Sequence, residues 1–301
     1  MAKHEASKMV YLKGHSGRRG LVGILARPAD FPPGVEATVF YTHLGSDWGQ
    51  EQFDFDVVSV SYIKADRTWW LAGKRGEIVE IGDDVSITKI PTADTGPGEK
   101  YGYLSEIRLI GEQLFVCGYR RQVYAKDGKN WMLISKEIID SRKKGPWVGF
   151  ESIDGFTPED LYAVGDEGEI WQYNGHDWHP CASPTNANLS CVRRIDNEMW
   201  ACGDKGTVLR LVSGAWSVVC CDEGPSAAWW SIEGHDGKVY VAGDDFLGVV
   251  DGDQVIQVST NIPPSTASLS ESEGVLWSVG ERHIFSHDGK KWKEHVAPEN
   301  A

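Results

Sequence analysis

Short hydrophobic runs alternate with polar turns along most of the chain, and one arrangement of them recurs six times. Each copy begins with an apolar run that ends in a glycine, followed by a polar turn, a second apolar run and another turn. The terminal glycines recur at intervals of 37 to 47 residues, which is typical of a propeller blade of four strands. No segment shows a sustained apolar stripe at helical spacing. The terminal glycines are Gly73, Gly118, Gly165, Gly203, Gly243 and Gly280.

Each unit divides into four short strands bounded by Gly, Asn, Asp and Ser, which is the pattern of successive hairpins. In the clearest unit we expect strands at 188–195, 199–202, 207–212 and 216–220. We expect the first glycine of each turn to adopt a positive φ, where a β-carbon is unfavourable. A tryptophan opens the fourth strand of several units, and we expect its ring to fill the joint between blades. These tryptophans are Trp131, Trp178, Trp216 and Trp292.

The repeats predict an all-β, single-domain β-propeller over residues 1–301, with six clear blades in 56–296. Residues 1–55 contain a degenerate seventh copy, with expected strands at 8–13, 20–26 and 37–43. Seven four-stranded blades is therefore the preferred count. The alternative is six blades, with the N-terminal residues forming a cap.

Two segments resemble the repeats of a known group of propellers. Residues 164–170 read Val-Gly-Asp-Glu-Gly-Glu-Ile, and residues 286–292 read Ser-His-Asp-Gly-Lys-Lys-Trp. This pattern is similar to Asp-box (BNR) repeats and to the propellers of photosystem II assembly-factor type. The resemblance implies the propeller fold, and no site residue is carried over from it.

Composition excludes some function classes and favours others. The chain has 30 Lys plus Arg against 44 Asp plus Glu, a formal net charge of −14, which disfavours binding to nucleic acid and favours a basic protein partner. Cys117 and Cys202 take positions filled by Ala or Val in other copies, so we expect small buried side chains there. No cysteine or histidine spacing indicates a metal site, and we expect no cofactor.

The N-terminal residues show no signal-peptide pattern, and no apolar run is long enough to span a membrane. We therefore expect a cytoplasmic protein that is a monomer on its own and does not bind membranes.

The clearest functional signal lies in turns that a propeller gathers on one rim. These turns are basic in two successive copies and acidic in later ones, and aromatic residues flank them. Arginine and aromatic residues are typical of protein-binding hot spots. The predicted contact residues are Lys74, Arg75, Tyr119, Arg120, Arg121, Arg142, Lys143, Trp147, Asp244, Asp245 and Phe246.

We therefore predict a non-enzymatic module that binds a specific protein partner on this rim. One specific form of it is an immunity-type protein that neutralises a toxin. One alternative is an assembly factor for a larger complex. Another is a propeller enzyme, a glycosidase or lyase, with a site at the mouth of the central channel. Its expected acid and base groups are Glu106, Glu151 and Glu271.

Overall fold

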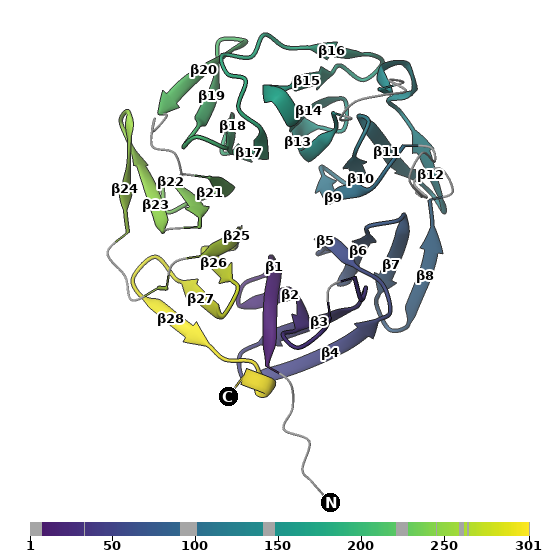
Figure 1. The fold of residues 1–301 in the computed structure, drawn as a ribbon, viewed down its shortest axis with the longest axis vertical. Coiled ribbons are helices and arrows are strands. Elements are labelled where there is room, and N and C mark those ends of the chain that lie inside the picture. The colour runs from purple at the N-terminus through teal and green to yellow at the C-terminus, as the bar shows by residue number, and fades with distance from the viewer. Residues whose placement is uncertain are drawn as a thin grey trace, which may run out of the picture.

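Seven four-stranded antiparallel sheets radiate from a common axis and form a ring (Figure 1). The computed structural model describes residues 8–32, 34–90, 101–140, 148–220, 228–244, 246–258, 262–263 and 265–300. In each sheet the strands lie side by side in chain order, so the first strand lies at the channel and the fourth at the outer edge. The seven-bladed propeller predicted from the repeats is confirmed, and the six-bladed alternative is excluded.

The blades are numbered in chain order. Blades 1 to 3 consist of β1 (Met9–Arg18), β2 (Leu21–Pro28), β3 (Thr38–Leu44), β4 (Asp47–Phe53), β5 (Val57–Ile63), β6 (Thr68–Gly73), β7 (Glu77–Ile81), β8 (Val85–Lys89), β9 (Leu104–Ile110), β10 (Gln113–Gly118), β11 (Gln122–Asp127) and β12 (Asn130–Leu133). Blades 4 and 5 consist of β13 (Phe150–Thr157), β14 (Asp160–Gly165), β15 (Ile170–Tyr173), β16 (Trp178–Pro180), β17 (Leu189–Ile195), β18 (Glu198–Gly203), β19 (Val208–Val212) and β20 (Ala215–Cys220).

Blades 6 and 7 consist of β21 (Trp229–His235), β22 (Lys238–Gly243), β23 (Leu247–Asp251), β24 (Gln254–Gln257), β25 (Thr266–Ser272), β26 (Val275–Gly280), β27 (His283–His287) and β28 (Trp292–His295). The helices of the described residues are three single 3-10 turns, η1 (Lys136–Ile138), η2 (Asp166–Gly168) and η3 (Pro298–Asn300). No helix in the described ranges is long and apolar enough to cross a membrane.

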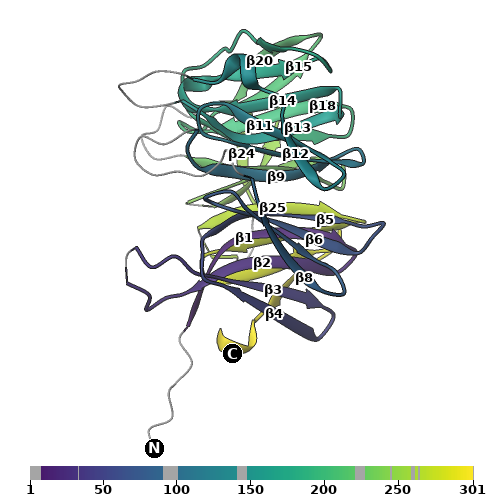
Figure 2. The same ribbon diagram turned by 90° about the vertical axis from the view of Figure 1, so that its right-hand side faces the viewer.

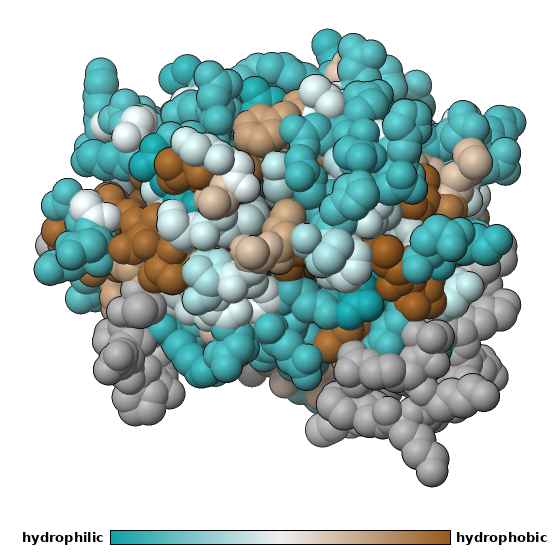
Figure 3. Space-filling model, turned by 90° about the horizontal axis from the view of Figure 1, so that it is seen from above, coloured by the Kyte–Doolittle hydropathy of each residue, from teal (hydrophilic) through white to brown (hydrophobic). Residues whose placement is uncertain are grey.

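The hydrophobic core is divided among the joints between neighbouring blades, which stack face to face around the ring (Figure 2). Tryptophans that open fourth strands fill these joints, as predicted. Trp178 of blade 4 packs with Phe115 of blade 3, and Trp216 of blade 5 packs with Tyr162 of blade 4. Cys117 and Cys202 are fully buried in the same layers. The outer surface in view in Figure 3 is mainly hydrophilic, with hydrophobic groups in separate patches.

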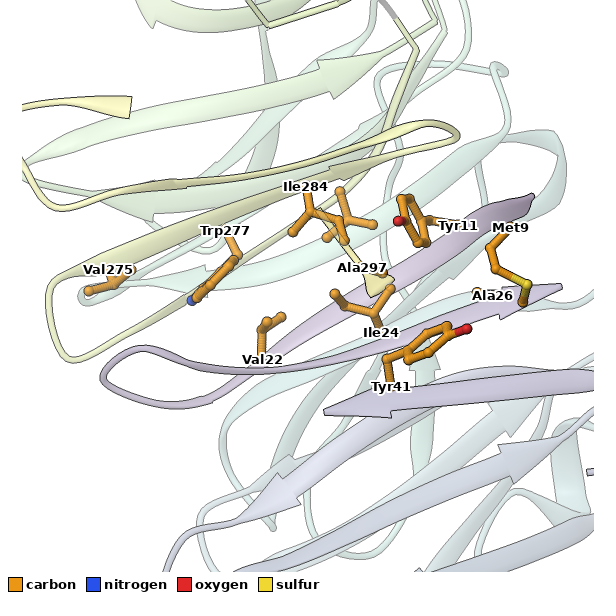
Figure 4. Close-up of a cluster of buried hydrophobic side chains, with 11 residues drawn as sticks. Met9, Tyr11, Val22, Ile24, Ala26, Tyr41, Val275, Trp277, Ile284 and Ala297 are labelled. Carbon is orange, nitrogen blue, oxygen red and sulfur yellow. The ribbon is translucent and has the colours of Figure 1, made fainter. Parts of the chain in front are cut away.

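The ring closes by packing between its first and last blades, and each of these blades is built from one continuous segment. Tyr11, Ile24 and Tyr41 of blade 1 pack with Trp277 and Ile284 of blade 7 in one buried cluster (Figure 4). Backbone groups cross the same joint. The Tyr11 N–H donates to the carbonyl of Glu281 (2.9 Å), and the Met9 N–H donates to Asn300 Oδ1 (2.8 Å). The first blade is therefore complete, and the alternative in which the N-terminal residues form a cap is wrong.

Polar side chains on the inner strands link several neighbouring blades around the channel. The Ser152 Oγ on β13 accepts a hydrogen bond from the N–H of Val192 on β17 (3.0 Å), and the Ser231 Oγ accepts one from the Leu269 N–H (3.0 Å). An inner strand has one unpaired edge, so its N–H groups need partners outside the sheet. The hydroxyls of Ser152 and Ser231 provide such partners along the channel.

The terminal glycines are required for a different reason from the one predicted. Gly165 has φ −176, an extended conformation open to any residue, and all six terminal glycines are absent from the positive-φ positions. A β-carbon at Gly165 would instead lie 1.8 Å from the carbonyl oxygen of Gly149, and one at Gly203 would lie 2.0 Å from that of Asn188. Close approach of the chain that enters the inner strand of the same blade, and not backbone dihedral freedom, therefore selects glycine.

Candidate functional site

A β-bulge lies near the start of every inner strand and turns one side chain toward the channel. The pairing of first and second strands shifts register in each blade, for example between Phe150 and Ser152 and between Trp229 and Ser231. An extra residue at a bulge re-aims its side chain, a device common next to binding sites. The seven bulge residues are Leu12, Val58, Ser105, Glu151, Ser190, Trp230 and Ala267.

All seven bulge residues line one cavity of about 860 Å³, which we call the channel mouth. A second set of residues surrounds them, and each member directly follows the terminal glycine of its blade. Every blade contributes to this cavity, so the mouth is a property of the whole ring. The second set consists of Lys74, Tyr119, Asp166, Asp204, Asp244 and Glu281.

Charge is divided unevenly around the channel mouth. Its cations, Lys13 and Lys74, lie on blades 1 and 2. Its carboxylates lie on blades 4 to 7 and outnumber the cations. They are Glu151, Asp166, Asp204, Asp244 and Glu281. The structure thus places opposite charges on opposite sectors of the mouth, which is the polarity expected from the turn sequences.

The carboxylates of the mouth have few partners. Asp204 accepts a hydrogen bond from Asn188 Nδ2 (3.1 Å), and Asp166 accepts one from the Gly149 N–H (3.0 Å). Within the described part of the chain, none of the five carboxylates forms an ion pair. Burial, together with the charge of Asp166, raises the pKa of Glu151 above its usual value. The carboxylates of blades 4 to 7 therefore give the mouth a net negative charge.

One large aromatic ring is exposed among these carboxylates. Trp230 is 43% exposed, and its Nε1 donates a hydrogen bond to Asp244 Oδ1 (2.8 Å). Its neighbour Trp229 is buried and packs edge to face on Phe246, with ring centroids 5.1 Å apart. Phe246, a predicted contact residue, is thus half-buried against the joint between blades 5 and 6.

The predicted basic turns are partly occupied by ion pairs within the protein. Lys74 lies at the mouth, with its Nζ 4.6 Å from the centre of the Tyr103 ring, and Tyr119 lies beside it. The Arg75 guanidinium donates to Glu36 (Nη2 to Oε1, 2.9 Å). Lys74 also lies 3.8 Å from Asp56 (Nζ to Oδ2), so both residues of this turn have a carboxylate partner within the protein.

Arg120 and Arg121 form the turn between β10 and β11, both with positive φ, 57 and 62. The Arg121 guanidinium pairs with Glu169 of blade 4 (Nε to Oε2, 2.8 Å) and lies over the Trp171 ring. Arg120 joins its turn to the following segment, since its N–H donates to the Val148 carbonyl and its carbonyl accepts from the Asp140 N–H. The predicted residues Arg142, Lys143, Trp147 and Asp245 lie outside the described residues.

Below the mouth, a buried ion pair crosses the channel. Glu106 on β9 binds Arg193 on β17 (Oε1 to Nη2, 2.7 Å), and the hydroxyl of Ser152 lies between them. Burial alone would raise the pKa of Glu106, but the adjacent Arg193 guanidinium holds it at about 2. A second pair joins Arg108 to Asp154 (2.8 Å). Side chains thus fill the middle of the channel, where the cavity volume falls to about 40 Å³.

The three glutamates suggested for an enzyme do not all lie in one site. Glu106 and Glu151 both line the small cavity in the middle of the channel, and Glu271 does not. Glu106 is held ionised by Arg193, and Glu151 lies at the mouth. Glu271 lies near the opposite ends of the inner strands, in a separate pocket, and accepts a hydrogen bond from the Gly274 N–H (2.7 Å). No group of three or more His, Cys, Asp or Glu side chains among the described residues is arranged to hold a metal ion.

Among the bulge residues, sequence reasoning singled out Glu151 as a possible acid or base and missed Trp230. The signal can be read once the strand register is known, because the residue paired with each terminal glycine is buried and the next residue faces the channel. Trp229 pairs with Gly243 as Phe150 pairs with Gly165, so Trp230 corresponds to Glu151.

Comparison with known proteins agrees with this architecture. The chain is similar in structure to the WD40 propeller domain of Doa1 (TM-score 0.66, 11% identity, 96% of this chain and 99% of that one). It is also similar to YCF48 from Cyanidioschyzon merolae (TM-score 0.65, 14% identity, 98% and 97%), which confirms the resemblance to propellers of photosystem II assembly-factor type.

In sequence, no family model matches the chain. It is 34% identical over 225 residues to the immune protein Tsi7 of Pseudomonas aeruginosa, which covers 73% of each protein. Identity at this level over this length is evidence of common descent, whereas the likeness to the solved structures shows the fold alone. The chain belongs to the family of the immune protein Tsi7.

Proposed function

We propose that this protein is an immunity protein that neutralises a toxin by binding it directly, without catalysis. The relationship to the immune protein Tsi7 is the observation that carries this proposal. The fold suits such a role, because a closed ring is rigid and a rigid surface loses little conformational entropy on binding.

We place the contact on the rim that surrounds the channel mouth. The predicted contact residues Lys74, Tyr119 and Asp244 line the mouth itself. Arg75, Arg120 and Arg121 lie on the same set of turns, although Arg75 and Arg121 also serve ion pairs within the ring. A positive φ at both arginines of one turn is unfavourable, and such strain occurs often at binding sites.

The partner that fits this surface is a basic protein. A net charge of −14 and the unpaired carboxylates of the mouth attract cations, and opposite fields speed association. In this proposal the protein acts in the cytoplasm as a monomer that forms a one-to-one complex with its toxin.

The direct test is co-expression of the protein with the toxic protein encoded beside its own gene. Growth should be restored, and the two purified chains should elute as one complex in size-exclusion chromatography. Toxicity that persists in the presence of this protein would refute the proposal.

The same experiment separates binding from enzymatic inactivation. After dissociation in denaturant and refolding, a neutralised toxin should have its unmodified mass and regain its activity. If the protein protects cells but the recovered toxin has an altered mass, the enzyme alternative is favoured. Glu151→Ala would then abolish protection.

A further inference from the structure

The exposed tryptophan of the channel mouth contributes little to the core of the ring. Trp230 occupies the bulge position of blade 6, where most other blades have an aliphatic side chain or serine. Trp230 is 43% exposed and lines the cavity, whereas Trp229 next to it is buried at the joint. A large, partly exposed aromatic ring in a concave site is a typical anchor for a protein partner.

The surroundings of Trp230 define the chemistry of what it can bind. Asp244 accepts the indole hydrogen bond through Oδ1, which fixes the ring beside a carboxylate and leaves the second oxygen to accept another. Asp204 and Glu281 lie on the flanking blades of the same cavity without ion pairs. An aromatic face next to carboxylates binds guanidinium and ammonium groups, because the ring quadrupole and the negative charges both attract a cation.

We propose that the acidic half of the channel mouth receives an arginine or lysine side chain on a loop of the toxin, with Trp230 as the anchor. This inference rests on the proposed function and adds the surface and the chemistry of recognition to it. The cation stacks on the Trp230 ring and pairs with Asp204 and Asp244.

The shape of the mouth favours a protein loop as the occupant. All seven blades line the cavity, and its volume of about 860 Å³ accommodates several side chains. The Glu106–Arg193 pair below closes the channel, so an inserted loop ends at a polar floor. A loop that fills this space excludes water from the carboxylates, which strengthens their attraction for the inserted cation.

The test uses the full-length protein and the toxin encoded beside its gene. The variants are Trp230→Ala and the pair Asp204→Asn with Asp244→Asn. The matched control is Asp236→Asn with Asp288→Asn, which removes the same charge from the pocket at the opposite ends of the inner strands. Association and dissociation rates are measured at low and high salt.

We expect Trp230→Ala to raise Kd about 30-fold or more, as for a hot-spot residue. The double Asn variant at the mouth should raise Kd about tenfold, mainly through slower association, and should weaken the salt dependence. The control pair should bind within about twofold of the unsubstituted protein, as expected for sites outside the contact. If Trp230→Ala does not fold, the test uses Trp230→Phe as a second variant, which keeps an aromatic ring.

The outcomes separate the two proposals. If the unsubstituted protein binds the toxin and the mouth variants bind it equally well, the inference is wrong and the proposed function stands. If the unsubstituted protein fails to bind the toxin, both are wrong. Weakened binding in the mouth variants, with unchanged melting temperatures and normal binding by the control pair, supports the inference.

Discussion

The Nε2 of His43 lies 2.9 Å from the Nδ1 of His295, and this contact joins β3 of the first blade to β28 of the last. The second nitrogen of His295 is 2.8 Å from the Ser286 hydroxyl. A matching pair joins blade 6 to blade 7, where His235 Nε2 lies 3.0 Å from His287 Nδ1. Each joint of the last blade thus contains a histidine pair. The two rings of a pair would repel each other if both were protonated.

We predict that acid weakens the closure of the ring. Burial lowers the pKa of His43, and burial together with His43 lowers that of His295 to about 4. Below its ordinary pKa of about 6.5 the unfolded chain therefore binds more protons than the folded one, and stability falls from pH 6.5 toward pH 4. His43 is buried and His295 is partly buried, and we expect a loss on the order of 1 kcal/mol per pair between pH 7.5 and 5.

Urea unfolding at both pH values measures this effect. A His43→Gln/His295→Gln variant keeps hydrogen-bonding groups at the joint without titrating in this range. Its stability should depend less on pH than that of the unsubstituted protein. An equal pH dependence in both proteins would show that other groups cause the acid effect.

Gly165→Ala should destabilise the fold strongly, because the new β-carbon would meet the Gly149 carbonyl 1.8 Å away. We expect a loss of about 3 kcal/mol or more, since two backbones must separate. Gly82→Ala is the control, since its β-carbon has a normal contact at 3.6 Å and no positive φ. Comparable unfolding midpoints in denaturant for the two variants would contradict this explanation of the repeated glycines.

The buried ion pair across the channel should tolerate the loss of both partners better than the loss of one. Glu106→Gln leaves Arg193 charged and buried without its counter-ion, and we expect it to cost about 3–5 kcal/mol. Replacing both residues, Glu106→Leu with Arg193→Leu, should cost less than the single change. The free energy of unfolding in urea decides this, and a double variant less stable than Glu106→Gln would contradict it.

The Arg121–Glu169 ion pair between blades 3 and 4 should contribute to the stability of the fold. Arg121→Glu places two carboxylates together in a half-buried site, and we expect a loss of about 2 kcal/mol. Adding Glu169→Arg should restore part of it by re-forming the pair in reverse. If thermal unfolding of the single and double variants gave the same midpoint, the pair would not contribute measurably to the joint.

Much of the fold could be predicted because the repeat is explicit in the sequence. Apolar runs, turn residues and the tryptophans of the fourth strands recur in register, and Trp178 and Trp216 lie in the joints where they were expected. The N-terminal blade was also recognisable, although it has no glycine at the end of its second strand.

The candidate site was less predictable, for identifiable reasons. A β-bulge adds one residue without changing the apolar pattern, so the channel-facing position of Trp230 is visible only once strand register is known. The partners of Arg75 and Arg121 are Glu36 and Glu169, which lie on other blades, 39 and 48 residues away. The role of the terminal glycines was predicted wrongly because a positive φ in a turn and a close approach of two backbone segments both favour glycine. The sequence alone does not distinguish the two.

Occupation of the channel mouth by a toxin is the central proposal for this ring. Hydrogen–deuterium exchange of the protein, alone and bound to the toxin encoded beside its gene, tests that claim directly. We predict that binding protects the turns at Asp204, Asp244 and Glu281 and the start of β21. Protection confined to the outer strands or to the opposite pocket, with the mouth exchanging as in the free protein, would contradict it.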